Sequence, residues 1–210
     1  MKDEILQTSL QQFLKCGIRE MSVQKLVAPL GISTKTVYKY FKNKEELLEE
    51  SLQLFFSQQN QLFEDLVKNR NTVTVLFEIW HKGIEMEYNV NKKLFHDLHY
   101  YYPELEKRVD AINAKKFWKR FIDIIQKGIA ESVFRKDIIP EVVLEGISVL
   151  YLSIVRIEQF KKFRVSTWQI LLNTITAYMR GICTEKGVHE LDKYISTYKR
   201  RKKFKAAERK

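Results

Sequence analysis

The chain has 210 residues, of which 45% are apolar and 30% charged, with a formal net charge of +11. This composition is typical of a folded protein, and the length allows one large domain or a small domain followed by a larger one. No run of about 18 uncharged apolar residues occurs, so we expect no membrane span, and the periodic N-terminus does not resemble a secretory signal. Cys16 and Cys183 lack the spacing of a metal site or a disulfide framework, which favours a cytoplasmic protein.

The positive charge is concentrated at the C-terminus. Residues 193–210 contain nine Lys or Arg and one Glu, so the sequence pI of about 9.5 is mostly a property of this tail. We expect the tail to be disordered or loosely helical, or else to add a contact to a DNA backbone. A prediction of DNA binding therefore has to rest on the arrangement of residues elsewhere in the chain.

Helical periodicity predicts an all-α fold, and the scarcity of breakers (seven glycines and three prolines) favours long helices. A first amphipathic helix ends at Gly17, a second follows the N-cap Ser22, a short third runs from Ser33 to about Phe41, and Asn43 caps a fourth. Further helices are expected over residues 72–88, 94–101, 104–130, 140–160 and 166–184.

The stretch "GISTKTVYKYF" predicts a helix with one buried side and one polar side. Val37 and Phe41 define the buried side on a helical wheel, and Lys35, Tyr38 and Lys39 fall roughly opposite. The helix is too short to be stable alone, so the two preceding helices must support it. The second helix, the turn and this third helix make a helix-turn-helix, whose second helix can enter a DNA major groove.

Lys44 stands in the first turn of the fourth helix, where a cation opposes the helix dipole by roughly 0.3–1 kcal/mol. The same helix end carries free N–H groups that attract anions. A DNA phosphate bound there would satisfy both the lysine and the helix end, so we expect Lys44 to be a phosphate contact.

These elements together resemble a known family. "IL", Phe13 and Gly17 in the first helix, "MSVQKLV" in the second, and "LGIS-TKTVYKYF-KNKEELL" after it are similar to the DNA-binding domain of the tetracycline-repressor (TetR) family of bacterial regulators. Pro29 departs from the family, which usually has a small helical residue there, and we expect it to kink the second helix. The resemblance implies DNA contacts from Ser22, Ser33, Thr34, Lys35, Thr36, Tyr38, Lys39, Tyr40 and Lys44.

The resemblance also implies a larger C-terminal helical bundle that dimerises and often holds an effector. The helices expected near 140–160 and 166–184 are apolar on more than one side, which favours a homodimer interface over a monomer surface, although both could simply be core. The expected domains are therefore a three-helix DNA-binding domain (1–48), an effector-binding and dimerisation domain (49–192) and the basic tail (193–210).

A candidate effector pocket is indicated by aromatic residues with polar neighbours in the middle helices. Aromatics at helical spacing are more often core residues, and this alternative stays open. His96 and His99 lie three positions apart without an evident third ligand, so we expect no metal site and no cofactor. The candidate pocket residues are Trp80, His81, Glu85, Phe95, His99, Tyr102, Trp118, Phe121 and Tyr151.

The sequence thus favours a cytoplasmic, homodimeric transcription regulator that represses from a palindromic DNA operator and is released by a small-molecule effector. The alternative is a DNA-localised protein-interaction module that needs no ligand. No nucleophile elbow, phosphate-binding glycine loop or convincing metal set occurs in the sequence, so we do not expect an enzyme.

Overall fold

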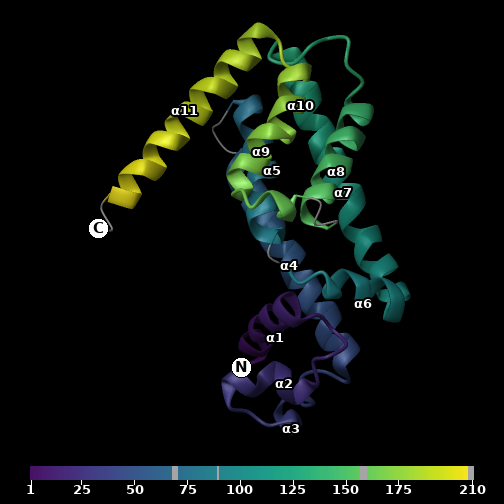
Figure 1. Cartoon of the computed structure of the whole chain (residues 1–210). Coiled ribbons are helices and arrows are strands. Elements are labelled where there is room, and N and C mark those ends of the chain that lie inside the picture. The colour runs from purple at the N-terminus through teal and green to yellow at the C-terminus, as the bar shows by residue number, and fades with distance from the viewer. Residues whose placement is uncertain (68–70, 89, 157–159, 208–210) are drawn as a thin grey trace. The chain divides into compact units, whose positions relative to one another are not determined.

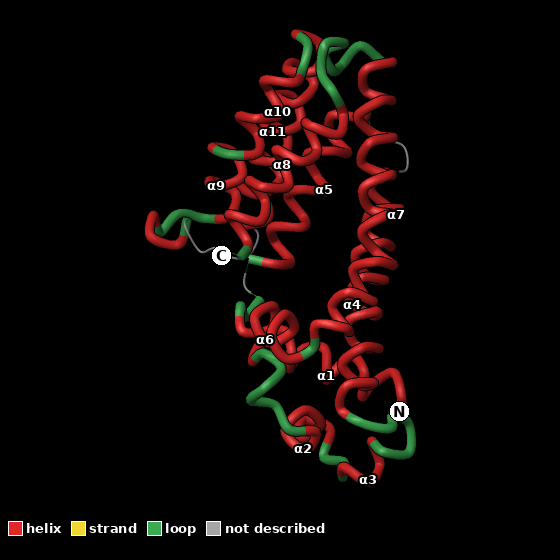
Figure 2. Tube along the Cα trace, turned by 90° about the vertical axis from the view of Figure 1, so that its right-hand side faces the viewer, coloured by secondary structure: helices red, strands yellow, loops and turns green. Residues whose placement is uncertain are grey.

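The structure, a computed structural model, describes residues 1–67, 71–88, 90–156 and 160–207, with side chains except at 110, 112–116 and 199–207 (Figure 1). Within these ranges the chain forms helices joined by turns and loops, and its one β-type pairing is an isolated bridge between Phe134 and Cys183 (Figure 2). The predicted all-α class is confirmed. No helix of the described residues is long and apolar enough to cross a membrane.

The chain divides into two compact units. The first comprises residues 1–63 and 89–117, and the second comprises residues 64–88 and 118–210. The functional division expected at residue 48 falls inside the helix α4 (Lys44–Val67) and stays a prediction. The contacts group the chain differently because residues 89–117 pack with the N-terminal helices.

The first unit begins with α1 (Lys2–Cys16), α2 (Val23–Val27), the 3-10 turn η1 (Ala28–Leu30) and α3 (Thr34–Val37), followed by α4. The predicted caps are confirmed at Ser22 and Ser33, whose hydroxyl oxygens accept hydrogen bonds from the backbone N–H groups of Lys25 and Thr36. These caps satisfy N–H groups that have no partner within their own helix, and so fix where each short helix starts.

Two later helices complete the first unit, α6 (Lys93–Tyr101) and the N-terminal part of α7 (Pro103–Ala130). Leu94 and Leu98 of α6 and Leu105 of α7 are buried in the same core as the N-terminal helices. The N-terminal helices therefore share one hydrophobic core with α6, which is about 50 residues further along the chain. The other buried members of this core include Ile5, Phe13, Ile18, Leu26, Val37, Phe41 and Leu47.

The second unit is built around α5 (Thr72–Glu87), which packs against α8 (Pro140–Val155), α9 (Thr167–Asn173), α10 (Ile175–Ile182) and α11 (Glu185–Ala207). The helix expected over 72–88 is capped by Asn71, whose side chain accepts the backbone N–H of Thr74 at 2.8 Å. A short 3-10 turn, η2 (Lys161–Phe163), precedes α9.

The C-terminal region contains one helix break and one helix, α11, that the sequence did not predict. The helix expected over 166–184 is broken at Thr174, whose hydroxyl donates to the carbonyl of Ile170 at 2.7 Å and whose backbone leaves the helical region. The backbone of the basic tail continues α11 as far as Ala207. Tyr194 and Tyr198 of α11 pack on Phe77 and Trp168, with the Tyr198 and Trp168 rings stacked 4.4 Å apart.

Candidate nucleic-acid interface

Three consecutive local features form the turn between α2 and α3: a proline in a 3-10 turn, a left-handed glycine and a serine cap. The kink predicted at Pro29 takes the form of η1, where the missing N–H of proline costs no helical hydrogen bond. Gly31 follows with φ of 64°, a left-handed conformation that glycine adopts without strain. Ser33 then caps α3, so the direction of α3 is set by local chemistry on both sides of Gly31.

The helix α3 is shorter than predicted, since α-helical geometry ends at Val37 and not near Phe41. Its continuation is a tight turn in which the N–H of Lys39 donates to Thr36 and that of Tyr40 donates to Val37. The last turn thus combines these i→i+3 hydrogen bonds with one i→i+4 bond from the N–H of Phe41 to the carbonyl of Val37. The side chains after Val37 are consequently rotated from their places on an ideal helical wheel.

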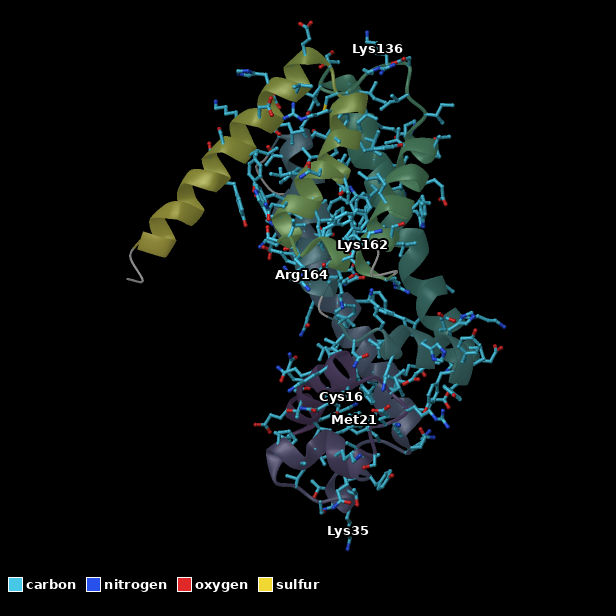
Figure 3. The ribbon with its side chains drawn as sticks, in the orientation of Figure 1. Cys16, Met21, Lys35, Lys136, Lys162 and Arg164 are labelled. Atoms are coloured by element: carbon cyan, nitrogen blue, oxygen red, sulfur yellow. The ribbon has the colours of Figure 1, made fainter. Side chains whose placement is uncertain are left out.

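The side chains predicted on the outer face, Lys35, Tyr38 and Lys39, are all solvent-exposed. Val37 and Phe41 are 1% and 2% exposed, whereas Tyr38 and Tyr40 are 53% and 42% exposed. Lys35 and Lys39 are also exposed, and Lys35 points away from the ribbon (Figure 3). Of the remaining predicted contacts, Ser22 and Ser33 are exposed while Thr34 and Thr36 are half-buried. The buried pair therefore holds a short segment whose lysines and tyrosines face outward.

Lys44 has a partner that the sequence did not predict. Its ammonium donates a hydrogen bond of 2.6 Å to the backbone carbonyl of Ile18, in the loop between α1 and α2. Burial lowers the pKa of Lys44, while the negative charge of Asp97 acts in the opposite direction. The phosphate contact expected for Lys44 stays a prediction, but its side chain is half-buried and already bonded to the main chain.

Asp97 of α6 is the residue in this unit that sequence reasoning missed. Its side chain is 7% exposed and accepts hydrogen bonds from the backbone N–H groups of Ile18 and Arg19, at 2.9 and 2.8 Å. The sequence feature that could have identified it is an aspartate beside Leu98 and three positions after Leu94, on the apolar side of an amphipathic helix. A carboxylate in that place needs a buried partner, which the pattern indicates but cannot identify.

The predicted pocket residues fall into two groups. In the second unit, the ring of Trp80 packs against Phe121 at 4.9 Å and Tyr151 at 5.3 Å. His81 lies on the same helix and is 1% exposed, with its Nε2 3.3 Å from the Glu85 carboxylate. Trp118 is half-buried on α7. Burial, followed by the nearby Glu87 carboxylate, raises the pKa of Tyr151, so its phenol stays protonated.

The other three predicted pocket residues belong to the first unit. Phe95 and Tyr102 are partly buried against its core. His99 is exposed and its Nδ1 lies 2.9 Å from a Glu106 carboxylate oxygen. Among the residues that the structure describes, no group of three or more His, Cys, Asp or Glu side chains is placed to hold a metal ion.

A helix-turn-helix with a buried anchor pair and an outward face of lysine, threonine and tyrosine, within an all-helical chain, defines a DNA-binding regulator. A sequence profile described as "Bacterial regulatory proteins, tetR family" matches residues 5–51. The chain therefore carries, at residues 5–51, a DNA-binding domain of the TetR family. It is accordingly a DNA-binding transcriptional regulator and not an enzyme.

Two relatives and one further structure give the extent of the similarity. The chain is 29% identical to the HTH-type transcriptional repressor KstR2 of Mycolicibacterium smegmatis over 147 residues, which cover 65% of this chain and 69% of that protein. The structure of the ketosteroid transcriptional regulator KstR2 of Mycobacterium tuberculosis superposes with a TM-score of 0.61 at 22% identity, covering 88% of this chain and 95% of that one. A protein from Saccharomonospora viridis, solved in complex with choline, gives a TM-score of 0.71 at 15% identity, covering 88% and 98%.

Proposed function

We propose that the protein is a homodimeric repressor that binds a palindromic operator in the cytoplasm and is released by a small-molecule effector. The observation that carries this proposal is the exposed face of α3 and its following turn, held by the buried pair Val37 and Phe41. In the proposed complex Lys35, Thr34, Thr36, Tyr38 and Lys39 meet the major groove, and Tyr40, Ser22 and Ser33 contact phosphates or sugars.

The operator can be obtained without knowledge of the regulated gene, by selecting duplexes from a random-sequence library with the wild-type protein. A homodimer with two recognition helices should select an inverted repeat with half-sites about one helical turn, roughly 34 Å, or a multiple of it apart. Selection of no preferred sequence would contradict the proposed function.

Tyr38→Ala tests the placement of the recognition surface. We expect its affinity for the selected operator to fall about ten- to a hundredfold, because a side chain at a base edge contributes roughly 1–3 kcal/mol of discrimination. The measurement is a mobility-shift titration, with sedimentation confirming that the dimer persists. Tyr100→Ala is the matched control, since Tyr100 is 67% exposed on α6 and outside the proposed interface. Equal affinities for wild type and Tyr38→Ala would refute this placement.

The proposed dimer is supported by an apolar stripe on α8. Val142, Val149 and Leu152 lie seven and three positions apart on that helix and are 62%, 55% and 42% exposed. On α10, Ala177 and Gly181 are exposed, and the space around Gly181 is open. Small residues let a second helix approach closely, and the apolar stripe gives it a surface to bury. A second copy of the same two helices would complete a four-helix interface.

The proposed effector pocket is centred on Trp80, Phe121 and Tyr151 of the second unit. The indole N–H of Trp80 is buried and has no hydrogen-bond partner among the described residues. Leaving such a donor unsatisfied costs about 1–3 kcal/mol. A largely apolar effector that carries an acceptor such as a ketone would remove this cost. The names of the similar proteins include a ketosteroid regulator and a choline complex, so one fold serves ligands of different chemistry.

The effector can be tested by titrating a 3-ketosteroid and, separately, choline into the protein–operator complex. An effector should dissociate the complex and raise the unfolding temperature of the free protein, because a ligand acts through its differential affinity for the two states. An operator complex that no small molecule dissociates would favour the alternative, a DNA-localised interaction module with a filled aromatic core.

A further inference from the structure

The loop between α1 and α2 is held from α6 by a single buried carboxylate. The oxygen Oδ2 of Asp97 accepts the N–H groups of two consecutive residues, Ile18 at 2.9 Å and Arg19 at 2.8 Å. Both N–H groups lie just past the end of α1, where the chain has left the helix and its hydrogen-bond pattern. Charge-assisted hydrogen bonds to a buried carboxylate are stronger than neutral ones, so this contact fixes the loop backbone.

The same short segment is held from α4 by a cation. The ammonium of Lys44 donates to the carbonyl of Ile18 at 2.6 Å. Asp97 and Lys44 therefore bind the backbone of one residue, Ile18, through its N–H and its C=O. Ile18 itself is fully buried in the core that also contains Val37 and Phe41, which anchor α3 and its following turn (residues 34–41, the recognition segment).

Residues in and just before α6 make further contacts with the end of α1 and the loop that follows it. The backbone N–H and the side-chain amide of Asn91 donate to the carbonyls of Leu14 and Lys15, at 2.8 and 2.9 Å, and so cap the last turn of α1. Gly17 leaves no room for a side chain, because a Cβ there would lie 2.8 Å from the Cβ of Lys93. The guanidinium of Arg19 lies over the ring of Tyr101, 5.0 Å from its centroid. The α6 segment thus contacts the end of α1 and the following loop along its whole length.

We propose that Asp97 is a positioning residue for sequence-specific DNA binding, which sets the placement of α2 and α3 through the backbone of Ile18 and Arg19. The loop it holds leads directly into Ser22, the cap of α2, and α2 packs against α3. Lys44, bonded to the other side of Ile18, begins the helix that follows the recognition segment. The elements on both sides of the recognition segment are therefore linked to the peptide group between Ile18 and Arg19, which Asp97 holds.

This role makes a different prediction for specific and non-specific DNA. Base-edge hydrogen bonds require α3 to be placed within a fraction of an ångström, whereas attraction to phosphates depends on the number of cations and tolerates displacement. Loss of the Asp97 contact should weaken binding to the operator and leave binding to random-sequence duplex nearly unchanged. A residue that only supported the fold would change both affinities together.

The experiment rests on the proposed function and uses the full-length protein with the operator selected by the wild type. For Asp97→Ala we expect the operator affinity to fall at least tenfold and the affinity for random-sequence duplex to change less than about twofold. Asp97→Asn keeps an acceptor oxygen at the same place and should recover most of the lost affinity. Glu104→Gln is the control, because Glu104 is an exposed carboxylate of the same unit that pairs with Lys107. Wild-type operator affinity in Asp97→Ala, or an equal loss for both DNAs, would overturn the proposal.

A measurement on the wild type tests the contact directly and does not require that Asp97→Ala folds. Amide hydrogen exchange of the free protein should show Ile18 and Arg19 strongly protected, since their acceptor is a buried carboxylate. Exchange of these two amides at the rate of an open loop would refute the contact itself. If the wild type selects no operator, the proposed function fails, and the exchange result still decides whether the contact exists.

Discussion

Lys44 and Asp97 are two charged residues whose main partners are backbone groups of one buried residue. Lys44 donates to the carbonyl of Ile18 and Asp97 accepts its N–H. In the sequence Lys44 stands out because it opposes a helix dipole, and a DNA phosphate is one way to explain it. The structure adds a second explanation, because the ammonium of Lys44 donates to the carbonyl of Ile18 and the nearby Asp97 charge helps to keep the lysine protonated. The salt dependence of DNA binding separates the two explanations.

We expect Lys44→Ala to weaken operator binding without changing the slope of log K against log salt concentration. Each lysine that neutralises a phosphate contributes about 0.9 to that slope. Lys44 is half-buried on Ile18, so its removal should release no counterion, whereas the exposed Lys39 should. Titrations of wild type, Lys44→Ala and Lys39→Ala at several salt concentrations give the three slopes. A slope for Lys44→Ala that is less steep by about 0.9 would support the phosphate contact instead.

The elements most fully predicted from the sequence are those defined by caps and periodicity. Ser22, Ser33 and Ser166 start helices as expected, because an N-cap is a local interaction between a side chain and the N–H three positions later. The break at Thr174 was missed because a threonine within an apolar run does not differ locally from a helical one. The packing of α6 with the N-terminal helices cannot be predicted from the sequence, because its contacts are distant: the partners of Asp97 lie 79 and 78 positions away.

The candidate site residues also divide into those that local sequence predicts and those that depend on tertiary packing. The exposed face of α3 follows from the spacing of Val37 and Phe41, which is local information. The separation of Phe95, His99 and Tyr102 from Trp80 and its neighbours could not be predicted, since helical spacing identifies which residues share a face but not which helices meet. The aromatic contact of α11 with α5 also depends on tertiary packing, since Tyr194 and Phe77 are far apart in the chain.

The start of α11 offers a test of its packing in the second unit. A Cβ on Gly187 would lie 2.0 Å from the carbonyl oxygen of Val133, which also accepts the N–H of Thr184 at 3.1 Å. We expect Gly187→Ala to lose about 1–3 kcal/mol of stability and to unfold roughly 5 °C earlier in a thermal scan. His189→Ala is the matched control, because His189 is an exposed residue on the same helix. An unchanged unfolding temperature for Gly187→Ala would contradict the close approach of α11 to residue 133.

The proposed function requires two copies of the chain. One recognition segment presents only a few side chains to bases, and the affinity of a single half-site is correspondingly low. Two segments tied together by a dimer bind as one unit, since the second half-site is met at a high effective concentration. The proposed α8 and α10 interface is therefore as necessary for repression as the residues that touch DNA, although it lies in the other unit.

Val149→Glu tests this dependence, because it places a charge in the middle of the exposed apolar stripe of α8. We expect sedimentation velocity to show a species of the monomer mass, 25.1 kDa, where the wild type shows twice that mass. Affinity for the full inverted repeat should fall at least a hundredfold, while affinity for an isolated half-site stays within about twofold of wild type. Val67→Glu is the control, since Val67 is an exposed valine at the end of α4 and outside the proposed interface. A Val149→Glu protein that remains a dimer at micromolar concentration would place the interface elsewhere, whereas a monomer that still binds the full repeat tightly would separate dimerisation from operator recognition.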